Sequence, residues 1–574
     1  MLITRVVLKG FRNFADATVS LERNTLIIGA NNVGKTNLVY ALRLLLDKSL
    51  SDAEIEPMES DFHISSAGKI SDYLSITIYF SEVSEDAVLA SLKGNITDDS
   101  CFVLQYTADR RSLTYQIKIG ATKPSLVEIP SRYYLKHINL RYVKSRRDLE
   151  KYINSEKRQL LKLSLENRSD EESKSDHRQM ARIGKALEAI NGRIRNLHYV
   201  KGATDAVNEE LQKLAHDFSD YEVKLDSGAI QVQQFIDSLR LGASTSGASV
   251  MLGGDGRNNQ ILMALWKAKS QREHDPDSEV VFYCVEEPEA HLHPHQQRKL
   301  ADYLINDLPG QTFITSHSPQ ITARYTPSSI VHLKVTGGRT KAASNGCSNC
   351  ISKAWDHLGY RMSILPAEAF FAKCVLLVEG PSEILFYSEL AKKLSIDLDF
   401  YNISILSVDG IQFSVYVKIL DAMEIPWVMR TDNDVSDITV KKVLQRHVAG
   451  INRCRAAATL TAEPHYPVGT TTQSLLADGT WDRISMETNP KGAYLSRVDL
   501  EHDLTEELES EVIAYACKKL KKRTLDAPSA IKYLQGKKAI RMRELLTQIS
   551  NSLPVIVGGH LARPLLHAKL LAEA

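Results

Sequence analysis

The sequence predicts an α/β protein with two sheet-containing regions, and three apolar runs carry that prediction. The first run, Leu26–Ile28, is followed by the glycine-rich loop Gly29–Thr36 and then by an amphipathic helix pattern. The second, Val280–Val285, leads into Glu286, and the third, Val375–Val378, leads into Glu379. Because open α/β sheets place their sites beyond the carboxyl ends of parallel strands, each of these three strand ends is a candidate site.

Composition bounds the class of protein. The 574 residues correspond to three or four compact units at the usual ~150 residues each. Lysine and arginine total 71 against 70 aspartate and glutamate, so any nucleic-acid surface is a local patch rather than an overall basic field. The seven cysteines lack the spacing of a disulfide scaffold, no apolar run approaches the ~20 residues that span a bilayer, and no signal-peptide pattern is evident. We therefore expect a soluble, cytoplasmic protein without a membrane partner.

Patterning divides the chain into a first region, 1–335, a linker of small and polar residues, 336–366, and a second region, 367–574. The second region becomes mostly helical from about 487. The strand patterns of the first region include Ile3–Leu8, Thr25–Gly29, Leu74–Phe80, Val103–Gln105 and Leu113–Ile119.

Residues 145–226 predict a helical insertion in the first region. Apolar side chains recur there every three or four positions, in two seams separated from an earlier helix by the polar stretch Glu166–Gln179. The seams are Met180, Ile183, Leu187, Ile190, Ile194 and Leu197, and then Val207, Leu211, Leu214, Phe218 and Tyr221. Two roles stay open for this arm: packing on its own domain and forming a dimer contact.

The loop Gly29–Thr36 matches the complete P-loop pattern, between a strand and a helix as that motif requires. Its backbone N–H groups converge on phosphates, Lys35 neutralises the β- and γ-phosphate oxygens, and the Thr36 hydroxyl reaches Mg²⁺. We predict that ATP with Mg²⁺ binds here. The predicted contacts within the loop are Asn31, Asn32, Gly34, Lys35 and Thr36.

The run that ends at Glu286 has the form of a Walker B strand. Glu286 is then expected to support Mg²⁺, and Glu287 to orient or deprotonate the attacking water. His317, directly after the next strand pattern, is placed like the switch histidine of ABC-type ATPases. Gly254 and Gly256 precede a helix pattern and are predicted to approach a phosphate as a signature loop does, although a simple turn remains an alternative.

The second region carries two acidic clusters after apolar runs. Glu379 is followed four residues later by Glu383, and a second run ends in Asp432 and Asp434. Carboxylate oxygens at one rim of a sheet are suited to a divalent metal. The alternative is a pair of solvated acidic turns.

The Leu8–Phe14 run, the P-loop, the Glu286–Pro294 run and His317 together resemble the RecF/SMC-like branch of ABC ATPases. The acidic clusters of the second region resemble the Toprim fold. In this order, the whole chain resembles the overcoming-lysogenization-defect (OLD) family of nucleases, most of all the Gabija GajA-type endonucleases.

This resemblance implies an ABC-type ATPase domain with a helical arm insertion, followed by a Toprim α/β domain and a mostly helical C-terminal extension. It further implies an ATP-binding, metal-dependent endonuclease that nicks or cleaves DNA in anti-phage defence under the control of the ATPase domain. Self-association through the ATPase domain, as a dimer or tetramer, is expected. A helicase-like partner or a retron reverse transcriptase is a further possible companion.

Site residues follow from the resemblance by position. Glu379 is the expected first-metal ligand and a base, with Glu383, Asp432 and Asp434 beside it. The later acidic motif matches Glu501 and Asp503, as ligands of a second Mg²⁺ or Mn²⁺, and the active-site lysine matches Lys538, with Lys537 as the alternative. Two such ions stabilise the attacking and the departing oxygen of a phosphodiester.

Two departures from the ATPase pattern qualify the prediction. Glu286 stands where aspartate is commoner, and the loop around Gly254 lacks the usual serine and glutamine. Nucleotide is therefore expected to act more as a sensor or gate than as fuel. The rival readings are a RecF/SMC-like DNA-repair ATPase or clamp with a non-catalytic Toprim unit, and a Toprim topoisomerase or primase.

Overall fold

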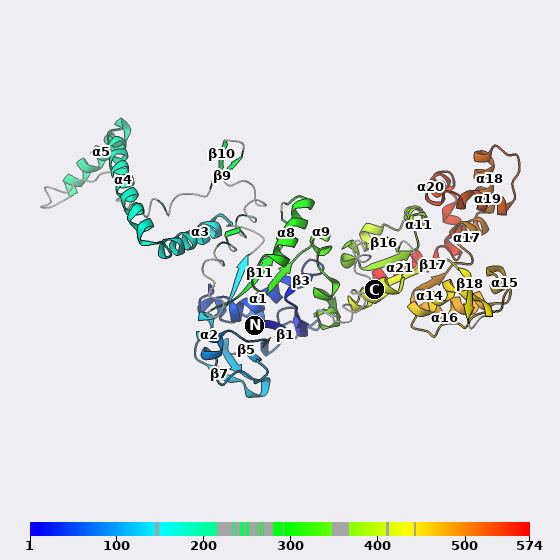
Figure 1. The fold of residues 1–574 in the computed structure, drawn as a ribbon, viewed down its shortest axis with the longest axis horizontal. Helices are drawn as coiled ribbons and strands as arrows, with labels where there is room; N and C mark the ends of the chain where they lie inside the picture. The colour runs from blue at the N-terminus through cyan, green and yellow to red at the C-terminus, as the bar shows by residue number, and fades with distance from the viewer. Residues whose placement is uncertain are drawn as a thin grey trace. The chain divides into compact units, whose positions relative to one another are not determined.

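The computed structural model describes most of the chain in ordered elements (Figure 1). The described residues are 1–143, 149–214, 242–245, 248–251, 279–290, 292–346, 367–408, 413–440 and 443–574, with isolated positions at 232, 236, 261, 264, 265 and 268. Two compact units are present: Met1–Lys144, Pro276–Glu289 and His293–Ala574 form one, and Ser145–Asp275 with Ala290–Leu292 form the other. In the ranges given above, no helix has the length and apolar character needed to cross a bilayer.

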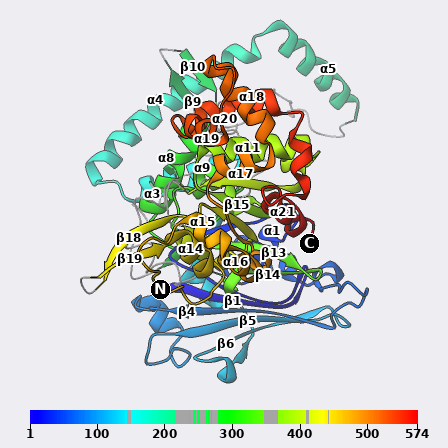
Figure 2. The same cartoon turned by 90° about the vertical axis from the view of Figure 1, so that its right-hand side faces the viewer.

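An antiparallel sheet of order β2-β1-β4-β5-β6-β7 opens the chain. Its strands alternate between buried and exposed side chains, because one face packs on the core and the other meets solvent. Figure 2 shows β1, β4, β5 and β6 side by side, as their pairing requires. The strands are β1 (Leu2–Phe11), β2 (Phe14–Ser20), β4 (Tyr73–Ser81), β5 (Phe102–Asp109), β6 (Thr114–Gly120) and β7 (Val127–Ile129), and the short helix α2 (Asp86–Ser91) follows β4.

A second sheet, of order β14-β13-β3-β12-β11-β8, is parallel except for β14. Its strands are β3 (Asn24–Ile28), β8 (Ile138–Val143), β11 (Val280–Glu286), β12 (Thr312–Thr315), β13 (Ile330–Thr336) and β14 (Arg339–Ala342). Helices α1 (Lys35–Leu46), α8 (Pro294–Asn306) and α9 (Pro319–Thr322) follow β3, β11 and β12. Because β3, β12 and β11 are consecutive parallel neighbours, their carboxyl ends lie at one edge of the sheet.

The insertion forms helices α3 (Leu149–Glu166), α4 (Asp170–Arg195) and α5 (His198–Leu214). The sequence assigned the polar stretch Glu166–Gln179 as a separator, but α4 already begins at Asp170. Ser169 explains this start, because its side chain caps the helix and Glu172 completes a capping box. No residue of α4 is buried, so its apolar seam is exposed or half-exposed in this chain. Phe218 and Tyr221 of the second seam lie outside the described residues. Short strands β9 (Gly242–Thr245) and β10 (Ala248–Met251) pair further along.

A third sheet, of order β16-β15-β17-β20, is parallel throughout. Its strands are β15 (Cys374–Val378), β16 (Ile403–Ser407), β17 (Trp427–Thr431) and β20 (Ala493–Leu495). The sequence placed 487–574 in a helical extension, yet β20 belongs to this sheet. Three residues are too few for a recognisable strand pattern, and only pairing with β17 defines them. Between β17 and β20 lie the hairpin β18 (Val435–Val440) and β19 (Val443–Val448) and helices α14 (Ala449–Ala457), α15 (Thr472–Ala477) and α16 (Thr480–Thr488).

The C-terminal helices pack against this third sheet. Leu376, Phe386, Leu500, Leu545 and Leu565 belong to one buried apolar cluster, which joins β15 to helices far apart in the sequence. The remaining helices are α11 (Pro381–Lys393), α12 (Leu398–Tyr401), α13 (Phe413–Ala422), α17 (Leu500–Glu507), α18 (Glu509–Leu520), α19 (Ala527–Gln535), α20 (Lys538–Ile549) and α21 (Arg563–Glu573). The helical C-terminus predicted from the sequence is confirmed. Its packing holds the first turns of α17 and α20 in the same core as β15.

Candidate nucleotide site and candidate metal centre

The P-loop joins β3 to α1 and is held from outside by Asn13. Gly34 has a φ of 107°, and a Cβ placed on it would lie 2.0 Å from Asn13 Nδ2. That amide donates to the Val33 carbonyl over 2.6 Å, so the loop and Asn13 fit together only with glycine at this position. Asn31 and Asn32 are exposed on the loop, and Thr36 is exposed in the first turn of α1.

Lys35 is turned into the loop. Its ammonium donates to the carbonyls of Gly29 and Ala30 over 2.9 and 3.0 Å. Burial lowers the pKa of Lys35 to about 8, although the charges of Glu287, Glu289 and Glu286 oppose the shift. These charges show that the lysine faces the acidic end of β11. The predicted P-loop lysine and Walker B carboxylates therefore lie in one place.

The end of β11 presents two glutamates in different surroundings. Glu286 is buried and accepts a hydrogen bond from the Tyr142 hydroxyl over 3.0 Å. Glu287 has a φ of 45°, and its carboxylate lies 3.7 Å from His317 Nε2. Burial and the charge of Lys35 lower the pKa of His317, while Glu287 opposes them. Lys35, Glu287 and His317 thus form one electrostatic group.

Glu289 is a residue of this site that sequence reasoning did not single out. Its Oε1 accepts from the Ser316 hydroxyl over 2.8 Å and from the His317 N–H over 2.7 Å. Burial raises the pKa of Glu289. It ties the segment that carries His317 to the end of β11. In the sequence it was one of three glutamates in a short run, with nothing to mark this role. Gly254 and Gly256, the predicted signature-loop contacts, lie outside the described residues.

Glu379 stands directly after β15 and is fixed by the end of the neighbouring strand β17. Its Oε1 accepts from the Thr431 hydroxyl over 2.6 Å and from the Asp432 N–H over 2.8 Å. The two acidic clusters predicted from separate strands are therefore brought together by parallel pairing of β15 with β17.

Arg453, on α14, completes this arrangement and was not predicted. Its Nη2 lies 3.0 Å from Glu379 Oε1 and 2.7 Å from Asp434 Oδ2, and its Nε donates to the Thr431 hydroxyl over 2.7 Å. The same Nη2 donates to the Asp432 carbonyl over 2.9 Å. No sequence signal distinguished this arginine from Arg455 on the same helix, because only the tertiary fold brings α14 to the carboxylates.

Several carboxylates of the candidate metal centre, besides Glu379, are buried. Glu383 and Asp432 are both buried, and burial raises both pKa values while the charge of Arg430 opposes the rise. Glu501, in the first turn of α17, is only 1% exposed, and neither of its carboxylate oxygens accepts a hydrogen bond. Burial raises the pKa of Glu501 as well. A buried carboxylate without donors is costly unless a cation satisfies it.

Lys538 supplies a positive charge beside the buried carboxylate of Glu501. Its Nζ lies 3.8 Å from Glu501 Oε2, so Lys538 is the member of the Lys537–Lys538 pair that contacts the cluster. Burial alone would lower the pKa of Lys538, but nearby carboxylates outweigh it and raise the pKa. Those carboxylates belong to Glu501, Asp432, Asp499 and Glu383.

Asp503 has different surroundings from Glu501. It is fully buried and pairs with Arg430 over 2.8 Å and with His560 Nε2 over 3.2 Å. Its oxygens also accept from the backbone N–H groups of Arg497 and Val498 over 3.2 and 3.1 Å. Protein donors thus engage this carboxylate, and its role as a metal ligand stays a prediction.

The chemistry of these side chains fits a divalent metal. All the acidic side chains present hard oxygen donors, and Glu501 offers two buried oxygens without hydrogen-bond donors. Among the described residues, however, no three His, Cys, Asp or Glu side chains converge as ligands of a single ion. Arg453 instead pairs with both Glu379 and Asp434, and Arg430 pairs with Asp503.

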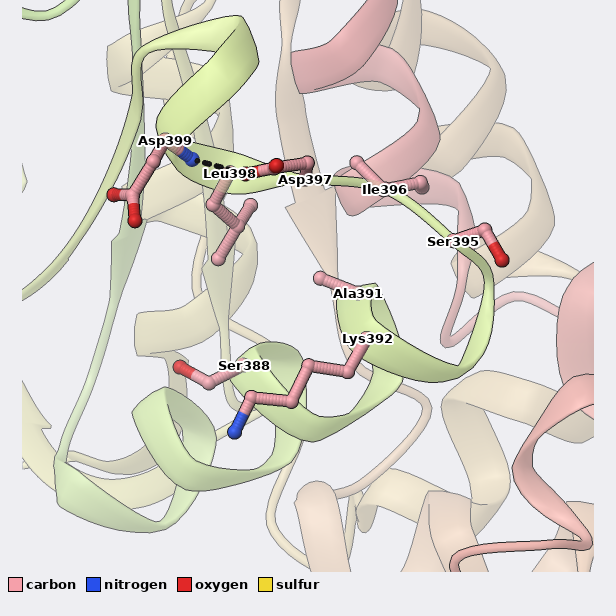
Figure 3. A pocket seen from close by; sticks show the side chains of 8 residues that line it. All are labelled: Ser388, Ala391, Lys392, Ser395, Ile396, Asp397, Leu398 and Asp399. Atoms are coloured by element: carbon pink, nitrogen blue, oxygen red, sulfur yellow. Dashed lines mark hydrogen bonds between the residues drawn. The ribbon is translucent and has the colours of Figure 1, made fainter.

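A surface pocket lies elsewhere in this region (Figure 3). It is bounded by the last turns of α11 and the start of α12, where Asp397 caps the short helix by accepting from the N–H of Asp399. The acidic side chains of the candidate metal centre instead include Glu383, in the first turn of α11. The pocket is therefore not the candidate metal centre. The lining residues are Ser388, Ala391, Lys392, Ser395, Ile396, Asp397, Leu398 and Asp399.

Protein-family models match both regions of the chain. A model described as an AAA ATPase domain matches residues 1–123 and 111–322, which is more than half of the chain. The chain belongs to the AAA ATPase domain family. A second model, described as the Toprim domain of overcoming-lysogenization-defect-like proteins, matches 370–434. This Toprim match contains Glu379, Glu383, Asp432 and Asp434, whereas Glu501 and Lys538 lie beyond it.

Two curated relatives match most of the length of the chain. The chain is 24% identical over 579 residues to Endonuclease GajA of Bacillus cereus (strain VD045), covering 96% of each chain. It is also 24% identical over 476 residues to the uncharacterized protein YbjD of Escherichia coli (strain K12), covering 76% of this chain and 80% of YbjD. The predicted resemblance to OLD-type, GajA-like nucleases with an ATPase domain is confirmed.

Solved structures give a weaker likeness. The head of an SMC protein bound to the C-terminal winged-helix domain of ScpA has a TM-score of 0.39 and 16% identity, covering 60% of this chain and 97% of that one. An SMC head with an extended coiled coil, derived from Pyrococcus furiosus, has a TM-score of 0.37 and 13% identity, covering 62% and 98%.

Proposed function

We propose that this protein is an ATP-binding, metal-dependent DNA endonuclease of the OLD family that nicks or cleaves DNA in anti-phage defence. The observation that carries the proposal is Glu501, a buried carboxylate whose oxygens accept no hydrogen bond and which lies beside Lys538 and behind Glu379. GajA, similar over nearly the whole chain, is named an endonuclease, which supports the same activity.

The acidic residues would hold Mg²⁺ or Mn²⁺ in two positions. Glu379, Glu383, Asp432 and Asp434 are assigned to the first and Glu501 to the second. Asp503 remains a candidate for the second position. When bound, such ions activate water and stabilise the attacking and leaving oxygens of a phosphodiester.

The protein's own groups orient this site. Thr431 and the Asp432 N–H fix Glu379 through its Oε1. Lys538 places an ammonium beside the carboxylates, where it offsets negative charge that develops on the phosphate in the transition state. Arg430 and His560 hold Asp503 and so anchor the start of α17, which carries Glu501.

A supercoiled plasmid tests the activity directly. Purified protein with Mg²⁺ or Mn²⁺ is expected to nick or linearise it, and Glu379→Ala should abolish this. Glu389→Ala is the matched control, since Glu389 lies near the far end of α11, the helix that follows Glu379, where it accepts a hydrogen bond from Ser550. Cleavage by Glu379→Ala at the wild-type rate would refute the site. A covalent protein–DNA adduct after denaturant quenching would favour a topoisomerase, and metal-dependent DNA binding without cleavage would favour a clamp.

Nucleotide control of the nuclease rests on the hairpin β13–β14. Thr340 on β14 donates its hydroxyl to the P-loop carbonyl of Val33 over 2.7 Å. In the same compact unit, Lys334 and Lys341 of this hairpin pair with Glu424, which shortly precedes β17. One hairpin therefore contacts both the nucleotide loop and the turn that leads into β17, the strand that Asp432 follows. Lys35, Thr36 and Glu286 would bind ATP, and Glu287 and His317 would sense it. Through this link, bound ATP would shift the population between the conformations of the nuclease region.

Glu424→Gln tests that link without touching either site. We expect ATP to change the nicking rate of the wild type, and this response to shrink at least ~3-fold in Glu424→Gln while ATP affinity and nicking without ATP are retained. Lys35→Ala should abolish the response by preventing ATP binding. An unchanged response to ATP in Glu424→Gln would rule out the hairpin as the route.

Assembly and partners complete the proposal. A homo-oligomer formed through the ATPase domain, a dimer or tetramer, is supported by the exposed apolar seam of the helical arm, where Ile183 and Ile190 are 36% and 51% exposed. A cytoplasmic location and a helicase-like or retron partner are proposed by analogy with OLD-type systems. Mass photometry of the purified chain tests the homo-oligomer, with a variant in which Glu replaces Ile183 and Ile190 as the comparison.

A further inference from the structure

Arg453 pairs with one carboxylate from each of the two acidic clusters. One nitrogen, Nη2, reaches both Glu379 Oε1 at 3.0 Å and Asp434 Oδ2 at 2.7 Å, while Nε holds the Thr431 hydroxyl at 2.7 Å. The Arg453 side chain is 10% exposed and its contact with Glu379 is partly buried, whereas the Asp434 side chain is 53% exposed. We propose that Arg453 is a positioning residue of the nuclease site, a fixed cation that aligns Glu379 with Asp434 and lowers the affinity of this pair for a divalent ion.

The alignment follows from the shape of the guanidinium. Its planar set of N–H donors fixes direction as well as distance, and an arginine side chain carries its charge at every pH the protein meets. Glu379 Oε1 therefore has three donors from different elements: the Thr431 hydroxyl, the Asp432 N–H and Arg453. Three donors on one oxygen leave the carboxylate a single orientation.

The effect on metal binding follows from charge. A guanidinium between two carboxylates offsets the negative potential that attracts a divalent ion, and it repels that ion at short range. At Glu379 and Asp434, the bridging position is taken by Arg453.

Arg453 is not needed to anchor its own helix. Ile451, Cys454 and Ala457 of α14 are buried and pack the helix into the core. The neighbouring Arg455 on the same helix pairs instead with Glu463 and Glu487. Arg455 therefore offers a matched control of equal charge on the same element.

The test measures metal affinity separately from cleavage. Calorimetric titration of the full-length protein with Ca²⁺ and with Mn²⁺ is run for wild type, Arg453→Gln, Arg453→Lys and Arg455→Gln. Arg453→Gln removes the charge and should tighten the first divalent site ~10-fold or more. Arg453→Lys keeps the charge and should bind metal within about threefold of wild type, yet cleave at least ~10-fold more slowly because the planar fork is lost. Arg455→Gln should leave both quantities unchanged.

Thermal unfolding gives a second readout. With the arginine charge gone, Glu379, Asp432 and Asp434 repel one another, so Arg453→Gln should gain more melting temperature from Mn²⁺ than the wild type does. Metal affinity and metal-induced stabilisation that both match the wild type would overturn the inference. A lower melting temperature with unchanged metal affinity would assign Arg453 a structural role only and would overturn it too.

This inference rests on the proposed nuclease function, but the two can fail separately. If wild-type protein never cuts DNA while Arg453→Gln binds metal more tightly, the proposed function fails and the role of Arg453 toward metal stands. If Glu379→Ala abolishes cutting while Arg453→Gln leaves metal affinity unchanged, the proposed function stands and this inference fails.

Discussion

Lys538 Nζ and Glu501 Oε2 lie 3.8 Å apart, although their residues lie in the first turns of two different helices, α20 and α17. The pair is asymmetric, because Glu501 is almost fully buried and the lysine side chain is 52% exposed. The solvent-exposed lysine therefore places its positive charge beside a carboxylate that is held in the interior.

Replacing Lys538 with methionine should reduce plasmid cleavage ~10²–10³-fold, since it removes a cation that offsets charge in the transition state. The fold should survive, because the lysine side chain is half exposed. Lys537→Met is the control, and it should cut within a few-fold of wild type. The reverse pattern, with Lys537→Met inactive and Lys538→Met active, would move the active-site lysine by one residue.

Glu501→Gln should stabilise the metal-free protein while abolishing cleavage. The buried carboxylate has no hydrogen-bond donor, so a neutral isostere removes a desolvation cost of about 1 kcal/mol or more. Differential scanning fluorimetry in EDTA should show a higher melting temperature for the variant. Adding Mn²⁺ should then stabilise the variant less than the wild type. Glu506→Gln, on the exposed face of the same helix, should change neither value. A destabilised Glu501→Gln would show that Lys538 already satisfies this carboxylate.

The lowered pKa of Glu424 should make the stability of the fold depend on pH. Burial alone would raise its pKa, but donors from Lys334, the Ser344 N–H and Lys341 outweigh burial and lower the pKa to about 2 from its ordinary 4.5. A carboxyl with a depressed pKa stabilises the fold fully above its unfolded pKa and loses that contribution as pH falls from 4.5 toward 2. Because the side chain is about a third exposed, solvent screening reduces the contribution to about 1 kcal/mol.

The measurement compares the melting temperatures of wild type and Glu424→Gln between about pH 6 and pH 3. The wild type should be the more stable at the upper end, and the gap should close as pH falls. A gap that stays constant over this range would mean that Glu424 acts through its shape rather than its charge.

The parts of each site that were predictable from the sequence are those written in consecutive residues. The P-loop, the acidic end of β11 and the carboxylates after β15 and β17 each follow a buried apolar run, so local pattern identifies both the strand and the side chain at its end. Glu501 and Lys538 were assigned only through family resemblance, and the structure brings both to the same cluster.

The residues that were missed act across long stretches of chain. Arg453 reaches Glu379 from 74 positions away, and Thr340 reaches Val33 from 307. An isolated arginine or threonine carries no local signal for such a contact. The same reason explains β20, where pairing with β17 rather than its own three residues makes the strand.

Asn13, in the Leu8–Phe14 run, also makes long-range contacts, and it gives a test of the nucleotide loop. Its amide donates to Val33 O over 2.6 Å and to the Thr340 hydroxyl over 2.6 Å, and its Oδ1 accepts from Asn37 on α1 over 2.7 Å. Asn13→Ala therefore leaves a P-loop carbonyl with one donor fewer and should weaken ATP binding ~10-fold through loss of loop geometry. Asn24→Ala, at the opposite end of β3, is the control and should bind ATP as the wild type does. Fluorescent-nucleotide titration measures both, and equal affinities for the two variants would show that the loop keeps its shape without Asn13.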